Sequence, residues 1–240
     1  MKSSRTLDKY TVQARLLSAL LVALPIGLAT VAWFPDGVMG WGVVWGLVTW
    51  SGGTLLLAQF GRDAGKQKEP KLFESWGGKP TTRMLRHHDT TNAIMLERRH
   101  KKLKSLMRGV KLPTPEEEAA DPRAADEVYE ACGAFLREKT RDSKKFRLVF
   151  EENCNYGFRR NIWGMKPIGL AMTALGLAAI VAVPFLEPAA RSEERLGLGA
   201  VTAGIDLFLV LGWLFVIKPG WVRLAAEAYA ERLLEACERL

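Results

Sequence analysis

The chain alternates between long apolar stretches and strongly charged ones. Two runs near its start, residues 16–34 and 41–61, contain no Asp, Glu, Lys or Arg. Two later runs, 167–186 and 196–217, repeat the pattern, and Asp206 is their only charged residue. Each run is about the length that a helix needs to cross a hydrocarbon core roughly 30 Å thick. The pattern predicts an all-α integral membrane protein with four transmembrane helices, arranged as two hairpins at 16–61 and 166–217.

The distribution of basic residues predicts how the chain is oriented. Only Arg191 and Arg195, of 34 basic residues, fall in the connectors within the two hairpins. Lys and Arg are retained on the cytoplasmic side of a membrane. The first run also lacks a small-residue cleavage site, so we expect it to remain as a span rather than to be removed as a signal peptide. Both termini are expected in the cytosol, with a leader at 1–15, a helical domain at 62–165 and an amphipathic tail helix at 218–240.

The central domain is expected to fold as a small helical core. Apolar residues at helical spacing predict a helix over about 82–108 whose opposite side is basic. Thr114 and Glu117 form the pattern of a capping box, and Asp121 followed by Pro122 restarts the helix, which then runs to about 139. A third helix is predicted over about 143–160.

Charge is unevenly divided along this domain, within a chain whose net charge is +8. Residues 62–111 carry 14 basic and 5 acidic side chains, whereas 112–138 carry 2 and 8. One interpretation is that the acidic helix pairs with the basic ones or that lipid headgroups take some of the charge. The other is that the basic surface binds an anionic ligand, such as a nucleotide or a short nucleic acid. The candidate residues are Lys79, Arg83, Arg86, Arg98, Lys101, Lys104 and Arg108.

Three of these cations stand at an unusual place. Lys79, Arg83 and Arg86 surround the predicted helix start, where the helix dipole favours negative charge. A phosphate bound there would explain them, and so would a carboxylate from the acidic helix or from a neighbouring subunit. The preceding Gly-Gly-Lys is not a P-loop, because Phe73 stands where that motif needs its first glycine.

The sequence offers little for catalysis or for metal binding. His87 and His88 are adjacent on the predicted helix and point about 100° apart, and the HExxH spacing is absent. His88 is interpreted as a packed side chain. The three cysteines show no disulfide or zinc pattern. We therefore expect no enzyme, no metal and no cofactor.

Asp206 is the most informative charge, because it falls near the middle of the fourth apolar run. A carboxylate at the bilayer centre costs about 2.5–3.5 kcal/mol on insertion scales. Thr202 precedes it by one helical turn, so both belong to one polar stripe. That stripe is expected to face a pore, a water-filled cavity or another helix. The residue therefore marks either an ion path or proton site, or a buried polar contact between helices.

Two other stretches suggest how helices pack and move. A seam of small residues along the second run predicts close helix packing within a hairpin or between subunits; it consists of Gly42, Gly46, Thr49 and Gly53. Before the third run, aromatic and arginine residues suit a lipid interface, while Gly157 and Pro167 also suit hinges that couple the domain to the membrane. The juxtamembrane candidates are Tyr156, Gly157, Arg159, Arg160 and Pro167.

The tail carries a heptad pattern of apolar residues, which includes Val222, Ala226, Tyr229 and Leu233. Three heptads are marginal alone. We expect this helix to dock against the central domain or to bundle with copies of itself in a homo-oligomer.

The layout of two hairpins flanking a basic cytosolic helical domain resembles membrane effectors of bacterial anti-phage defence systems, of which the Hailong-type DNA-gated channel is one. The resemblance is architectural and assigns no functional residues. It implies an oligomeric channel or effector of the inner membrane that responds to a nucleotide or oligonucleotide. The alternative is a non-conducting scaffold or accessory subunit that recruits a cytosolic protein.

Overall fold

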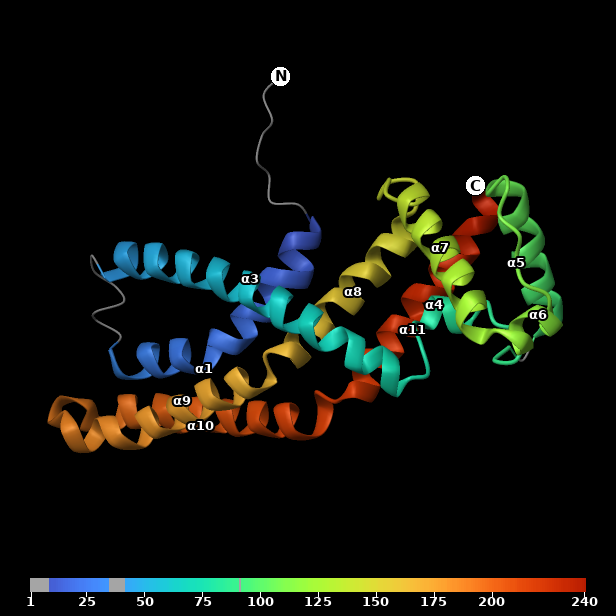
Figure 1. The fold of residues 1–240 in the computed structure, drawn as a ribbon. Coiled ribbons are helices and arrows are strands. Elements are labelled where there is room, and N and C mark those ends of the chain that lie inside the picture. The colour runs from blue at the N-terminus through green and yellow to red at the C-terminus, as the bar shows by residue number, and fades with distance from the viewer. Residues whose placement is uncertain (1–8, 35–41, 91) are drawn as a thin grey trace, which may run out of the picture. The chain divides into compact units, whose positions relative to one another are not determined.

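The computed structural model of the chain describes residues 9–34, 42–90 and 92–240, and its regular elements there are helices (Figure 1). The chain divides into two compact units. We call residues 1–68 and 157–222 the span unit, after the candidate membrane spans that it contains. Residues 69–156 and 223–240 form the head unit.

Three helices pack together in the span unit. They are α1 (Leu17–Trp33), α9 (Lys166–Leu186) and α10 (Glu193–Leu211). A π-helical stretch, Thr11–Leu16, precedes α1, another, Gly212–Val216, follows α10, and the 3-10 turn Pro188–Arg191 lies between α9 and α10. Each of the three helices contacts the other two, and α9 and α10 lie side by side as the expected second hairpin (Figure 1).

The same three segments are long and apolar enough to cross a membrane, over 11–33, 166–186 and 193–216. Several small residues of these segments are buried and many large apolar ones are exposed, a distribution that suits lipid. On α1, Ala19, Ala29 and Ala32 are buried, whereas Leu20 and Val31 are exposed. The exposed apolar side chains are compatible with a membrane environment.

The second apolar run lies on α3 (Gly42–Ser75), a single helix of 34 residues. The described residues thus give three candidate spans instead of the four expected, and the connector 35–41 lies outside them. Further along, α3 crosses the end of α8 (Arg147–Gly164) through two glycines. A Cβ on Gly164 would stand 2.5 Å from the Gly65 nitrogen, so the two backbones touch.

The head unit combines short helices with the C-terminal one. They are α4 (Pro80–Arg83), α5 (Ala93–Leu106), α6 (Pro115–Ala120), α7 (Pro122–Lys139) and α11 (Pro219–Ala236), which is followed by the 3-10 turn Cys237–Arg239. The capping box of Thr114 and Glu117 is present, and the Asp121 carboxylate accepts from the Ala124 N–H, so both predicted starts are confirmed. Parts of α3, α8 and α11 belong to each unit.

The single helix predicted over 82–108 is wrong. Residues 84–90 form turns between α4 and α5, and Asn92 caps α5 by accepting from the Met95 N–H at 3.0 Å. The N–H groups of His87 and His88 donate to the Glu118 carboxylate. A contact distant in the sequence therefore takes the hydrogen bonds that a continuous helix would have made.

The tail helix completes the core of the head unit. Leu233 and Leu234 on α11 are fully buried in one cluster with Leu103, Tyr129 and Leu136. The expectation that the tail docks against the central domain is confirmed, because its apolar face is used inside the same chain. The third predicted helix, 143–160, is α8, which begins at Arg147.

Candidate functional site

The cations before and after α4 are held by carboxylates of the head unit. Arg86 donates from Nε and Nη2 to the two oxygens of Asp126 at 2.7 and 2.6 Å, and from Nη1 to the Gly77 carbonyl at 2.8 Å. The hydrogen bond with Asp126 raises the pKa of Arg86 above its ordinary value, although burial opposes this. A Cβ on Gly78 would stand 2.8 Å from Arg86 Nη2, and Gly78 has a φ of 130°, so this turn requires glycine.

The other two cations of this group are paired as well. Lys79 Nζ lies 2.5 Å from Glu130 Oε2. Arg83 lies between Asp89 Oδ2 at 3.5 Å and Glu227 Oε1 at 3.7 Å. Because Asp126 and Glu130 are on α7, the acidic helix supplies the negative charge that the sequence seemed to lack at residues 79–86. No bound phosphate is needed to explain these three cations.

The basic side of α5 is different. Arg98 donates to Glu238 at 2.8 Å, yet 64 % of its side chain is exposed. Lys101, Lys104 and Arg108 are exposed, and none of them has an ion pair with a described residue. Lys101, Lys104 and Arg108, which we call the basic ridge, are therefore the predicted anion-binding positions that remain unpaired among the described residues.

A buried carboxylate that the sequence did not single out organises the head unit. Glu118, only 3 % exposed, accepts from the His87 N–H at 2.9 and 3.0 Å, from the His88 N–H at 3.2 Å and from the Tyr129 hydroxyl at 2.7 Å. Burial by itself raises the pKa of Glu118, but these hydrogen bonds outweigh it and lower the pKa to about 2. The capping-box pattern singles out Glu117, but nothing in the sequence indicates that Glu118 is the buried member of this acidic run.

The histidines contribute to packing and hydrogen bonding rather than converging on one ion. His87 Nε2 lies 3.1 Å from the Pro113 carbonyl, and His100 Nε2 lies 2.8 Å from the Leu85 carbonyl. Burial lowers the pKa of His100. His88 Nδ1 lies 2.7 Å from Glu118, but 61 % of its side chain is exposed, so its interpretation as a packed side chain is wrong.

Asp206 lies inside the three-helix bundle of the span unit. Its side chain is fully buried, and neither carboxylate oxygen has a hydrogen-bond partner among the described residues. A Cβ on Gly176 of α9 would stand 2.8 Å from Asp206 Oδ2 and 3.0 Å from Pro25 Cβ of α1. Thr202 is buried as well, with 6 % exposed. The polar stripe thus faces neighbouring helices of the same chain, which is one of the surroundings that the sequence allowed.

The small-residue seam can be followed only at its end. Gly42, Gly46 and Thr49 lie where the structure describes the helix but not the side chains. Gly53 is exposed, and a Cβ on it would meet nothing within 4 Å. At this position the seam packs against no described residue of its own chain.

The juxtamembrane residues pack within their units. In the span unit, a Cβ on Gly157 would stand 2.7 Å from Tyr10 Oη, and Arg160 is 7 % exposed beside the Gly65 backbone. Arg159 Nη1 donates to the Trp221 carbonyl at 3.0 Å, and Pro167 lies in the first turn of α9. In the head unit, the Tyr156 hydroxyl donates to Glu69. Gly157 thus allows close packing against Tyr10, a role that the prediction of a hinge did not include.

Asn161 is a residue of this stretch that sequence reasoning missed. It is 1 % exposed, and its amide donates to the Ala14 carbonyl at 2.8 Å while its oxygen accepts from Arg160. A polar side chain inside a run of aromatic and arginine residues gave no signal that it bridges two helices.

Comparisons with known proteins identify no relative: no family model matches the chain, and neither a curated protein nor a solved structure is significantly similar to it.

Proposed function

We propose that the chain is an oligomeric effector of the bacterial inner membrane whose head unit binds a nucleotide or short oligonucleotide and thereby opens a pore. The basic ridge is the observation that carries this proposal. It presents three exposed cations without a partner among the described residues, in a unit that pairs its other predicted anion-binding cations with carboxylates.

The spacing of the ridge suits a chain of phosphates. Lys101 and Lys104 are three residues apart and Arg108 follows four residues later, so they succeed one another along one side of α5 and the turn after it. Cations that neutralise phosphates release counterions, which makes such binding strongly dependent on salt. In this proposal both termini and the head unit lie in the cytosol, where such a ligand is made. The first half of α3 is then the fourth span.

The ligand is tested by titrating the full chain in detergent with short single-stranded DNA and with mononucleotides at several salt concentrations. Changing Lys101, Lys104 and Arg108 together to Gln is expected to weaken binding and to reduce the log–log salt slope by about one for each phosphate that is no longer neutralised. The matched control changes Arg123, Arg141 and Lys144 to Gln, which removes the same charge from exposed positions off α5. Equal losses in both variants, or binding only to anionic-lipid vesicles, would contradict the proposal.

The pore is tested by ion flux in proteoliposomes, with and without the ligand found in the titration. Ligand-dependent flux that disappears in the ridge variant is the expected result. Equal flux in the ridge variant and in its matched control would show that the ridge does not control conduction.

A second candidate, a non-conducting scaffold that recruits a cytosolic protein, is favoured by the place of Asp206. Its carboxylate lies between α1, α9 and α10 of one chain, and so faces no surface at which copies would meet. Absence of flux together with a stable cytosolic partner in co-purification would favour the scaffold.

A further inference from the structure

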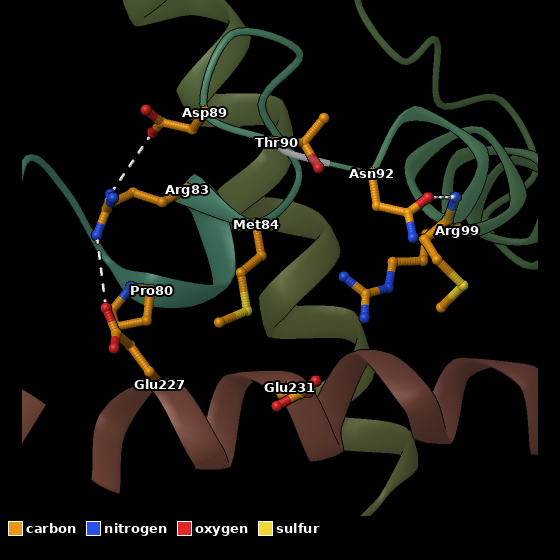
Figure 2. Close-up of a pocket in the computed structure, with 10 residues that line it drawn as sticks. Pro80, Arg83, Met84, Asp89, Thr90, Asn92, Arg99, Glu227 and Glu231 are labelled. Atoms are coloured by element: carbon orange, nitrogen blue, oxygen red, sulfur yellow. Dashed lines mark hydrogen bonds and ion pairs between the residues drawn. The ribbon is translucent and has the colours of Figure 1, made fainter. Parts of the chain in front are cut away.

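A cavity of about 360 Å³ opens in the head unit between α4, α5 and α11. Figure 2 shows the side chains that line it, with Arg83 and Asp89 on one side, Arg99 on the other and Glu231 on the α11 wall. Its volume lies at the lower end of the range for small-molecule sites, which is about 300–1,000 Å³.

The charges around this cavity are not all used. Arg83 is engaged by Asp89 and Glu227, and Glu227 also accepts from Arg223 at 2.7 Å. Arg99 and Glu231, in contrast, have no ion pair within 4 Å among the described residues, although both line the same cavity. Arg99 Nε is buried and without a hydrogen-bond partner there, and the guanidinium points into the cavity (Figure 2). The guanidinium donors of Arg99 and the carboxylate acceptors of Glu231 thus line the same cavity without forming an ion pair with each other.

The remaining walls suit a flat ring. Met84 points into the cavity (Figure 2), and Met95 also lines it. Thioethers make favourable contacts with aromatic systems. The lining carries three carboxylates, on Asp89, Glu227 and Glu231, against two guanidiniums, so its balance is slightly negative. The cavity therefore suits an uncharged ring better than a phosphate.

We propose that this cavity binds the guanine base of a nucleoside or nucleotide, with Arg99 and Glu231 reading two of its edges. Guanine presents two neighbouring acceptors, O6 and N7, which match an arginine fork. Its N1–H and N2 amine are two neighbouring donors, which match a carboxylate. Adenine has an acceptor at N1 beside its amine, so a carboxylate at that edge is repelled. The site lies on the side of α5 away from the basic ridge and does not depend on it.

The test is calorimetric titration of the full chain in detergent with guanosine, guanosine monophosphate and adenosine. Guanosine and its monophosphate are expected to bind with similar affinity, because the phosphate stays outside, and adenosine at least tenfold more weakly. Glu231→Gln is expected to weaken guanosine binding by about tenfold, the effect of removing one bidentate pair of hydrogen bonds. Glu235→Gln, on the same helix and outside the cavity, is the matched control and is expected to change nothing.

Glu231 is exposed, so Glu231→Gln is expected to leave the fold intact and to report on guanosine binding alone. Arg99→Met is a second variant, for which we expect the same loss of guanosine binding. No saturable guanosine binding, equal binding of adenosine, or binding unchanged in Glu231→Gln would overturn the proposal. The ridge variant is expected to bind guanosine normally. Loss of DNA binding and loss of guanosine binding are therefore separate outcomes, and either proposal can fail alone.

Discussion

Two carboxylates are buried in the described part of the chain, one in each unit, and their surroundings are opposite. Glu118 in the head unit is surrounded by donors: two backbone N–H groups, a tyrosine hydroxyl and a histidine ring. Asp206 in the span unit has no described donor, and its Oδ2 and the ring of Pro25 both lie close to Gly176. The Glu118 carboxylate therefore has hydrogen-bond donors at both oxygens, whereas the Asp206 carboxylate has none among the described residues.

The hydrogen bonds of Glu118 give it a structural role, whereas no hydrogen bond to a described residue explains why Asp206 is buried. A buried polar group without a hydrogen bond costs free energy, whereas a charged group with several hydrogen bonds fixes the segments that provide them. Glu118 holds the turns after α4, and these turns carry Asp89, which lines the cavity. The Asp206 carboxylate, in contrast, makes no hydrogen bond with a described residue, so no such contribution to stability is evident for it.

The largest effect is expected from Glu118→Gln. Glutamine replaces one of the two accepting oxygens with an NH2 donor, and in either orientation of the amide this donor faces at least one backbone N–H group. A hydrogen bond to a charged group contributes about 1.5–3 kcal/mol, and this change weakens several such bonds at once. Hydrogen exchange of peptides covering 84–92 measures the loss. Glu116→Gln, at an exposed position of the same helix, is the control and is expected to change stability by no more than about 0.5 kcal/mol. Equal exchange in both variants would show that Glu118 is dispensable.

The pH dependence of the head unit is the next effect. The pKa of Glu118 is about 2 in the folded chain and 4.5 ordinarily, so its contribution is complete above pH 4.5 and is lost as the pH falls toward 2. At about 1.4 kcal/mol per pH unit this is about 3 kcal/mol. Thermal unfolding of wild type and Glu118→Gln should therefore differ widely at pH 7 and converge near pH 2. A constant difference would contradict the assignment.

Local patterns in the sequence were sufficient for part of this architecture. The capping box at Thr114, the restart at Asp121 and the apolar face of the tail depend on residues a few positions apart, and each was predicted correctly. Three candidate spans followed from apolar length and composition alone. These features need no knowledge of what the segment packs against.

What failed depends on contacts distant in the sequence. The helix predicted over 82–108 is broken by Glu118, which lies about thirty residues from the N–H groups that it accepts. Periodicity placed Asp206 and Thr202 on one stripe, but only the fold shows that the stripe meets Gly176. The pairing of Arg86 with Asp126 was one of several partners that charge allowed, and geometry selects it.

A smaller effect is expected in the span unit, from Gly176→Ala. The added methyl would stand 2.8 Å from Asp206 Oδ2 and 3.2 Å from the Pro25 carbonyl carbon, so α1 and α10 must shift. Overpacking of this kind costs about 1–3 kcal/mol. SDS-induced unfolding measures it, against Gly204→Ala on α10, where a Cβ meets nothing within 4 Å. If both variants unfold alike, the junction around Asp206 is loosely packed.

The smallest effect on stability is expected from Asp206→Asn, which completes the contrast with Glu118→Gln. The carboxylate has no hydrogen bond to a described residue and the volume is kept, so the change should stay within about 1 kcal/mol in the same SDS unfolding assay. A destabilisation as large as that of Glu118→Gln would mean that the carboxylate has a partner in the assembled protein. With stability unchanged, flux in proteoliposomes becomes decisive: altered conductance would place Asp206 in the conducting machinery. Unaltered conductance would remove it from the path.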